Sequence, residues 1–354
     1  MIPIKLGNIQ ALRGIAVLLV IFCHMQAIEQ KYGRGAHLLP DWFDYAKASV
    51  DLFFVISGLV IATVTRGQFQ SLRAARHFFF QRITRIYPPY WLYSAVVLMI
   101  WLYHPEMVNS AQGSRVNILA SFLLLPQDLL PLLMVGWTLI HEMYFYVVIA
   151  MVIPFIPERM FPFWLALWAL VVILGSGYLM TNTDRDYNPA IRVALHPFTL
   201  EFIGGAACAL LLNYTLRGHA RFIMGLGVVA FLVATFWLDT NDLTLNTEGW
   251  RRVLFFGIPA LLVVHGAASA EIGGTLYFPK MLRAVGDASY SLYLSHVLVL
   301  SAIGRVWAQL NNPGVISHIV ILVTMLLATL IVGLMSYRWV EVPILNKIRT
   351  WRAQ

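Results

Sequence analysis

The chain has 354 residues, of which 59% are hydrophobic and only 12% are charged. A soluble domain carries about 25% charged residues, so the composition excludes a soluble enzyme and predicts an all-α protein that crosses a membrane many times. The formal net charge of +8 does not indicate a nucleic-acid partner, because in a membrane protein the distribution of basic residues between loops matters more than their total.

Apolar segments of crossing length follow one another along the whole sequence, and we predict about ten transmembrane helices. Most basic residues fall in alternate loops, which places both termini in the cytoplasm by the positive-inside rule. Only a short tail follows the last span, so we expect one transmembrane domain over residues 1–354 and no fused soluble domain. The predicted spans are 9–28, 50–65, 86–104, 137–156, 162–180, 196–214, 222–238, 252–270, 288–306 and 315–337.

The first predicted helix carries Arg13 and His24, and the arginine inside it argues against a cleavable signal peptide. Eleven residues are about three helical turns, so both side chains share one face, roughly 16 Å apart along the axis. Polar groups at such depth are costly. A neutral histidine there can take the proton of a hydroxyl, as acyl transfer to an alcohol requires. A histidine that only hydrogen-bonds between helices is an equally good interpretation.

The second predicted helix opens at Asp51. A carboxylate near His24 would orient the imidazole and stabilise its charged form, as the acid of a catalytic triad does. The alternative is that Asp51 caps the free amides at the start of the helix. Position alone favours the cap slightly.

Arg82 and Arg85 lie three apart in the most basic loop, just before Pro88 and Pro89, which we expect to start the third span. With Arg13, these arginines would suit the phosphates of an anionic ligand. The alternative is ordinary anchoring of basic residues to lipid headgroups. The apolar piece 118–125 is too short to cross and is predicted to be re-entrant or interfacial.

The fourth span places His141 and Glu142 in the outer half of the membrane. Glu142 and Tyr146 are four residues apart and share a face, so they can hydrogen-bond or line a cavity together. Glu142 is thus a second candidate acid for His24. A structural polar clamp between helices is the alternative. Glu201, in the sixth span, is a weaker candidate of the same kind.

The ninth predicted helix begins with the run from Gly286 to His296. Its Ser289, Tyr293 and His296 follow roughly helical spacing and are candidates to line a cavity. Small and polar residues also mediate packing between membrane helices, and that interpretation has the better support from sequence alone.

Together these segments resemble the acyltransferase-3 family, integral-membrane enzymes that O-acylate bacterial surface glycans and some other acceptors. The resemblance covers nearly the whole chain, and its strength lies in several motifs occurring in the family's order. The matching pieces are Arg13 to His24, Asp51 to Gly58, Arg82 and Arg85, Trp137 to Tyr146, Gly286 to His296, and Val340 to Pro343.

The resemblance implies a membrane O-acyltransferase in the bacterial cytoplasmic membrane. It implies an acyl-CoA donor entering from the cytoplasm, a glycan or lipid-linked saccharide as acceptor, and membrane lipids as surroundings, with no metal. His24 would be the catalytic base, and Arg13, Arg82 and Arg85 would handle the donor. The compact form resembles exopolysaccharide acetyltransferases, which favours acetyl-CoA. The competing class is a transporter or flippase for a glycan or lipid, against which the lack of internal repeats counts weakly.

Overall fold

Helices make up all the regular secondary structure of the residues that the structure describes, which are 6–33, 37–182, 187–212, 217–241, 249–310 and 314–353. The structure is a computed structural model. The first five residues, predicted to be cytoplasmic, lie outside the described residues. The chain forms two compact units. We call Phe54–Thr215 the mid-chain unit, and Ile4–Phe53 with Leu216–Gln354 the terminal unit.

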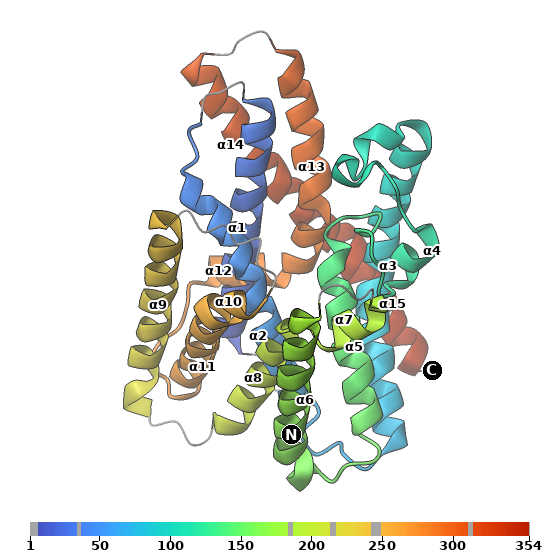
Figure 1. Ribbon diagram of the computed structural model, residues 1–354, viewed down its shortest axis with the longest axis vertical. Helices are drawn as coiled ribbons and strands as arrows, with labels where there is room; N and C mark the ends of the chain where they lie inside the picture. The colour runs from blue at the N-terminus through green and yellow to red at the C-terminus, as the bar shows by residue number, and fades with distance from the viewer. Residues whose placement is uncertain are drawn as a thin grey trace. The chain divides into compact units, whose positions relative to one another are not determined.

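The terminal unit contains the first helix and the whole C-terminal part of the chain. Within it α1 packs against α12 and α13, α13 packs against α14, and α9 lies beside α11 (Figure 1). Its elements are α1 (Gly7–Tyr32), η1 (Asp41–Ala48), η5 (Arg217–His219), α9 (Ala220–Thr240), α10 (Trp250–Arg252), the π-helix η6 (Val253–Gly257), α11 (Ile258–Ile272), α12 (Lys280–Asp287), α13 (Ser289–Gln309), α14 (Val315–Ser336), the π-helix η7 (Tyr337–Glu341) and α15 (Val342–Ala353).

Helix α2 (Ser49–Val64) begins in the terminal unit and continues into the mid-chain unit. There α3 packs against α5, and α6 packs against α8. The other elements of the mid-chain unit are α3 (Leu72–Tyr103), η2 (Pro105–Met107), η3 (Ser110–Gln112), α4 (Ile118–Leu123), α5 (Gly136–Val152), η4 (Glu158–Met160), α6 (Phe161–Thr181), α7 (Pro189–Ala194) and α8 (Phe198–Leu211).

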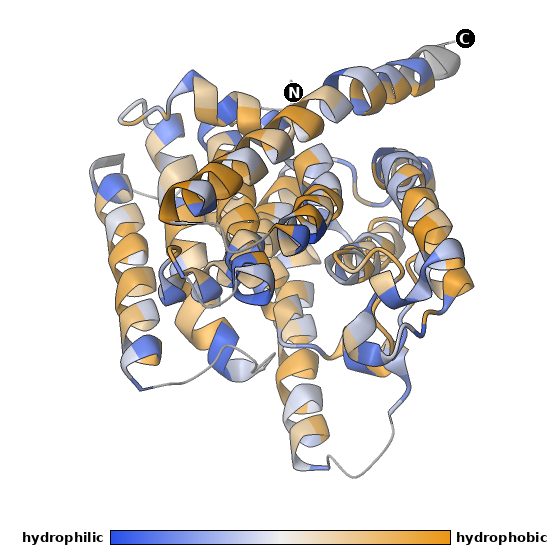
Figure 2. Ribbon diagram, turned by 90° about the horizontal axis from the view of Figure 1, so that it is seen from above, coloured by the Kyte–Doolittle hydropathy of each residue, from blue (hydrophilic) through white to orange (hydrophobic). Residues whose placement is uncertain are grey.

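Eight helical segments of the described residues are long and apolar enough to cross a membrane. Each of the predicted spans overlaps a helix, so the prediction of an all-α polytopic membrane protein is confirmed. The predicted spans 86–104 and 137–156 lie outside these eight, within α3 and the 17-residue α5. Figure 2 shows apolar residues along the lengths of the helices. Phe222 and Phe236 of α9 are 69% and 70% exposed, which suits lipid rather than water.

Helix α3 begins earlier than predicted. Its first residue is Leu72, and the side chain of Ser71 caps it by accepting a hydrogen bond from the amide of Ala74 at 3.1 Å. The helix then passes through Pro88 and Pro89 without a break, so the prediction that the proline pair starts the span is wrong. Prolines interrupt helical hydrogen bonds, but membrane helices tolerate them. The basic segment and the predicted third span are therefore one helix.

The predicted short apolar segment is the six-residue helix α4, which ends where Leu124 takes a left-handed conformation. Three aromatic side chains of α3 hold it by its carbonyl groups. Tyr87, Tyr90 and Trp91 donate to the carbonyl oxygens of Leu123, Ser121 and Phe122, each at 2.8 Å. Helix α4 spans far fewer residues than a crossing needs.

The start of α1 is fixed by a carboxylate from α11. Glu271 accepts hydrogen bonds from the backbone amides of Gly7 and Asn8, both at 2.7 Å. These amides have no partner inside the helix, and a negative charge at a helix N-terminus is favourable. The contact sets where α1 begins and hence the positions of Arg13 and His24 along it.

Helices α1 and α12 cross at glycines. A Cβ at Gly286 would overlap the carbonyl oxygen of Gln10, and a Cβ at Gly14 would meet that of Leu282. Small residues allow membrane helices to approach this closely. Since α13 begins two residues after α12 ends, this crossing also fixes the first turns of α13 against α1.

We expect Gly286→Ala to lower the stability of the protein by about 1–3 kcal/mol or more, because the added methyl group overlaps backbone and forces the helices apart. Thermal unfolding in detergent, followed by tryptophan fluorescence, measures the change. Gly225→Ala is the matched control, since no atom of the described residues lies within 4 Å of a Cβ at that helical position. Equal stability of the two variants would contradict the close crossing.

Candidate active site

His24 lies on the same unbroken helix as Arg13, as the sequence predicted. The His24 Nδ1 is 2.9 Å from the carbonyl oxygen of Val20, one turn earlier. Because a carbonyl oxygen only accepts, Nδ1 carries the proton, and the lone pair of the neutral ring is on Nε2. His24 is partly exposed. The backbone of α1 thus presents His24 as an acceptor for the proton of a hydroxyl group.

Arg13 occupies the other end of this face and is partly exposed. It precedes Gly14, one of the glycines where α1 crosses α12. A guanidinium group keeps its charge under all ordinary conditions and binds phosphate with several donors. Helix α1 therefore carries a fixed cation about three turns before a proton acceptor.

Asp51 hydrogen-bonds Arg252 and makes no hydrogen bond to His24 among the described residues. It lies in the first turn of α2 and is fully buried. Its oxygens accept from Arg252 Nε at 3.0 and 3.3 Å and from Nη2 at 2.8 Å. Arg252 Nη2 also donates to the carbonyl oxygen of Lys47 at 2.9 Å. This buried ion pair joins α2, α10 and η1 of the terminal unit.

The mid-chain unit holds a cluster around Glu142. The Tyr146 hydroxyl donates a hydrogen bond to Glu142 Oε1, and the Ser57 hydroxyl donates to the same oxygen at 3.3 Å. The expected contact between Glu142 and Tyr146, one turn apart on α5, is confirmed. The Arg82 guanidinium lies over the ring of Tyr146, 5.5 Å from its centroid.

Arg82 is only partly exposed, and its Nε atom is buried with no hydrogen-bond partner among the described residues. Its guanidinium also lies over Phe78, 5.3 Å from the ring centroid. Arg85, one turn later on α3, is partly exposed. The aromatic rings hold Arg82 in place, and no carboxylate forms an ion pair with it within the described part of the chain.

His141 lies within an aromatic cluster of the same unit and is 7% exposed. Its ring is edge-on to His196, with centroids 4.9 Å apart, and to Trp137 and Phe198. Its Nδ1 has no hydrogen-bond partner among the residues described. His196 was not predicted as part of this cluster, because no local pattern links it to His141. Glu201, the weaker candidate, is buried on α8.

Ser289, Tyr293 and His296 all lie buried on α13, which favours the packing interpretation for this segment. On the same helix the Ser291 hydroxyl donates to Glu341 Oε2 at 2.5 Å. This bond joins two of the motifs noted in the sequence, Gly286 to His296 and Val340 to Pro343. The ring of His296 also contacts that of His24, with centroids 4.8 Å apart.

Glu29 and His318 form a further buried polar contact in the terminal unit, a hydrogen bond with Oε1 and Nε2 2.6 Å apart. Sequence reasoning missed this pair, because its members are 289 positions apart. No group of three or more side chains that could hold a metal ion occurs within the described ranges.

These observations describe a polytopic helical membrane protein with a polar face built on its first helix. The family model described as "Acyltransferase domain" matches residues 6–338. The chain belongs to this family, acyltransferase-3, as the resemblance implied, and it is an acyltransferase. Family membership favours an enzyme over the transporter or flippase considered from sequence.

Relatives of the chain include an exopolysaccharide production protein and O-acetyltransferases. It is 28% identical over 329 residues to "Exopolysaccharide production protein ExoZ" of Rhizobium meliloti strain 1021, covering 88% of this chain and 93% of that protein. It is 24% identical over 371 residues to "O-acetyltransferase OatA" of Staphylococcus aureus, covering 98% of this chain and 58% of that protein. For "Peptidoglycan O-acetyltransferase OatA" of Listeria monocytogenes the identity is 23% over 378 residues, covering 95% and 55%.

The chain therefore spans nearly all of the ExoZ protein but little more than half of the OatA proteins. No solved structure matches the chain.

Proposed function

We propose that this protein is a membrane-bound O-acetyltransferase that moves an acetyl group from cytoplasmic acetyl-CoA to a hydroxyl of an exported or cell-surface glycan, or of its lipid-linked precursor. Its family supports acyl transfer, and the names of its relatives support an acetyl group and a polysaccharide acceptor. We place it in the bacterial cytoplasmic membrane with both termini inside. Because the family match spans both units, we treat residues 1–354 as one acyltransferase domain.

The observation that carries this proposal is the hydrogen bond from His24 Nδ1 to the Val20 carbonyl oxygen. This hydrogen bond leaves Nε2 as the basic nitrogen of His24. A polar side chain inside a membrane is energetically costly, which favours a functional role for it. A hydroxyl group that attacks a thioester must lose its proton, and a positioned histidine can accept that proton as a general base. We assign that role to His24.

The reaction we propose is direct transfer. His24 Nε2 takes the hydroxyl proton while the hydroxyl oxygen attacks the thioester carbon, so an O–H bond breaks and a C–O bond forms. The tetrahedral intermediate then loses the C–S bond, and the departing thiolate takes the proton from His24. The base is thereby regenerated, and the products are an ester and free coenzyme A.

We assign the phosphates of the donor to Arg13, Arg82 and Arg85. Each is a permanent cation able to form charge-assisted hydrogen bonds with phosphate. Tyr146, which hydrogen-bonds Glu142 in the mid-chain unit, is assigned to the lining of a cavity. Glu142 is our second candidate for the acid that supports His24, and His141 is assigned to the lining of the acceptor's path.

The direct test uses purified protein in detergent or nanodiscs with acetyl-CoA and a polysaccharide or lipid-linked saccharide. We expect release of free coenzyme A that depends on both the protein and the acceptor, and an acetyl ester on the glycan by mass spectrometry. Release without ester formation would contradict transfer to a glycan. Comparing the envelope and secreted glycans of cells with and without the protein then identifies the hydroxyl.

A second experiment separates direct transfer from an acyl-enzyme route. Protein is mixed with radioactive acetyl-CoA in the absence of acceptor and quenched within one turnover. We expect no stoichiometric label on the protein. Label in a one-to-one ratio would overturn the direct mechanism and require a nucleophilic side chain.

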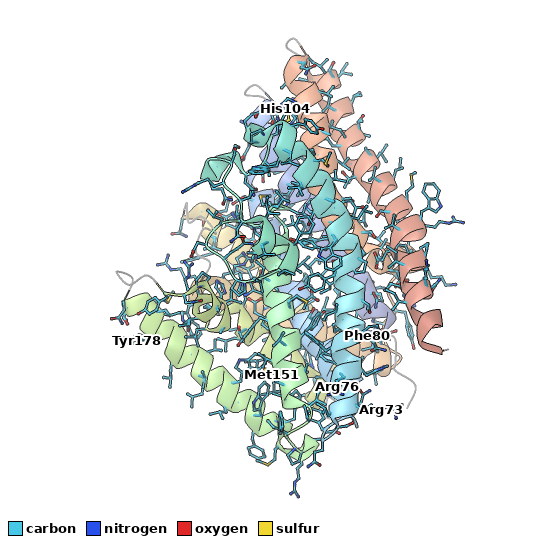
Figure 3. The ribbon with its side chains drawn as sticks, turned by 90° about the vertical axis from the view of Figure 1, so that its right-hand side faces the viewer. Arg73, Arg76, Phe80, His104, Met151 and Tyr178 are labelled. Atoms are coloured by element: carbon cyan, nitrogen blue, oxygen red, sulfur yellow. The ribbon has the colours of Figure 1, made fainter. Side chains whose placement is uncertain are left out.

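We expect the double variant Arg82→Ala and Arg85→Ala to bind the acyl donor about tenfold or more weakly, because each arginine contributes charge-assisted hydrogen bonds to phosphate. Isothermal titration with a nonhydrolysable acyl-CoA analogue measures the affinity. Arg73→Ala with Arg76→Ala is the matched control, since both are exposed cations at the start of the same helix (Figure 3). Unaltered affinity with lost activity in the Arg82 and Arg85 variant would contradict the assignment.

A further inference from the structure

The side chain of His24 has a second histidine against it. Helices α1 and α13 pack together in the terminal unit, and there the rings of His24 and His296 meet edge to face. Their centroids are 4.8 Å apart and their planes are inclined at 76°. His296 is fully buried, so any effect that it has on the reaction is exerted through the side chains that it contacts.

Both histidines are held in the same way by their own helices. The Nδ1 of His296 lies 3.3 Å from the carbonyl oxygen of Leu292, as that of His24 lies 2.9 Å from Val20. Each Nδ1 therefore carries the proton, and each neutral ring has its lone pair on Nε2. In His296 this Nε2 is buried with no hydrogen-bond partner in the part of the chain that the structure describes. Buried polar atoms without partners are uncommon and costly.

Two buried carboxylates of this unit, Asp51 and Glu29, hydrogen-bond groups other than His24. Asp51 forms its hydrogen bonds with Arg252, and Glu29 pairs with His318 and accepts from the amides of Leu38 and Leu39. A neutral imidazole beside His24 has one advantage over a carboxylate. It adds no permanent negative charge to a membrane interior, where an unpaired charge is expensive, yet it attracts a cation through its lone pair or its ring.

We propose that His296 is the positioning residue of His24: the Val20 carbonyl oxygen holds Nδ1, and the neutral ring of His296 lies against the imidazole and stabilises its charged form. This inference rests on the proposed function, in which His24 gains a proton from the acceptor hydroxyl and loses it to the leaving thiolate. His296 holds the ring of His24 in place and stabilises the imidazolium while it exists. It exchanges no atom with the substrates, so no covalent bond forms or breaks at His296.

Two substitutions separate the chemical role of His296 from its space-filling role. His296→Phe keeps an aromatic ring of similar size but has no acceptor, whereas His296→Gln has a different shape and keeps an acceptor oxygen. We expect the phenylalanine variant to lose about 10- to 100-fold in kcat. We expect the glutamine variant to retain most of its kcat, and both variants to keep the wild-type KM for acetyl-CoA. Ser295→Ala, which removes a neighbouring hydroxyl that contacts the Leu292 carbonyl oxygen, is the matched control.

A role in packing alone predicts the opposite order, with phenylalanine active and glutamine impaired, and that result would overturn the proposal. Size-exclusion profiles and thermal unfolding identify a variant that fails to fold. If a variant fails to fold, its kinetics are replaced by nitrogen-15 spectra of the histidine rings in the wild-type protein, recorded over a pH titration. The proposal is overturned if the His24 signals stay unchanged while His296 titrates. A His24→Asn protein that transfers acetyl groups at the wild-type rate would instead refute the role of His24 as the base, and a wild-type protein that transfers none would refute the proposed function.

Discussion

His24→Asn is expected to lower kcat for acetyl transfer by about 10²- to 10⁴-fold, the contribution of a general base. The asparagine amide can still donate to the Val20 carbonyl oxygen in place of Nδ1, but the side chain has no basic nitrogen. The protein should therefore fold normally and bind the donor as before. Initial rates of coenzyme A release, with and without acceptor, measure the effect.

Two further variants separate the loss of the base from a loss of folding. His24→Ala removes both the base and the bond to Val20, and we expect its rate to be as low as that of His24→Asn. His104→Ala is the matched control, because His104 is exposed and its side chain contacts the exposed Glu106, so its rate should stay within about twofold of wild type. If the rate of His24→Asn also stayed within about twofold of wild type, His24 would not be the base.

Much of the fold followed from the sequence, because crossing lipid requires about 20 apolar residues in a row and such runs are local. Helix α3 shows the limit of that reasoning. The proline pair at 88 and 89 is a local signal for a helix start, yet the helix begins at Leu72 and continues through it. A membrane environment supports a helix whose hydrogen bonds are interrupted. The sequence alone therefore did not show whether the proline pair starts the helix or lies inside it.

In the candidate site, too, some contacts could be predicted from the sequence and others could not. The contact of Glu142 with Tyr146 follows from spacing on one helix, as does the shared face of Arg13 and His24, because helical geometry alone sets these relations. The contact of His24 with His296 depends instead on which helices pack together. That packing depends on features such as the glycine at 286, whose need for close approach is visible only in three dimensions.

Asp51→Asn is expected to destabilise the protein by about 3–5 kcal/mol, because it removes the negative charge from a buried ion pair with Arg252. The two side chains are 0% and 5% exposed, so water cannot replace the lost partner. Unfolding in detergent, followed by fluorescence, measures the loss. Asp44→Asn is the matched control in the same unit, since the ion pair of Asp44 with Lys47 is partly exposed and should contribute about 0–1 kcal/mol.

The double variant Asp51→Leu with Arg252→Met decides between a structural and a chemical role for Asp51. Replacing both members of a buried ion pair with apolar residues of similar size is often neutral or stabilising, so we expect the stability to return. If Asp51 serves only the packing of α2, α10 and η1, acetyl transfer returns with it, to within about an order of magnitude. A stable double variant as inactive as His24→Asn would instead assign Asp51 to the reaction and make Arg252 the residue that holds it there.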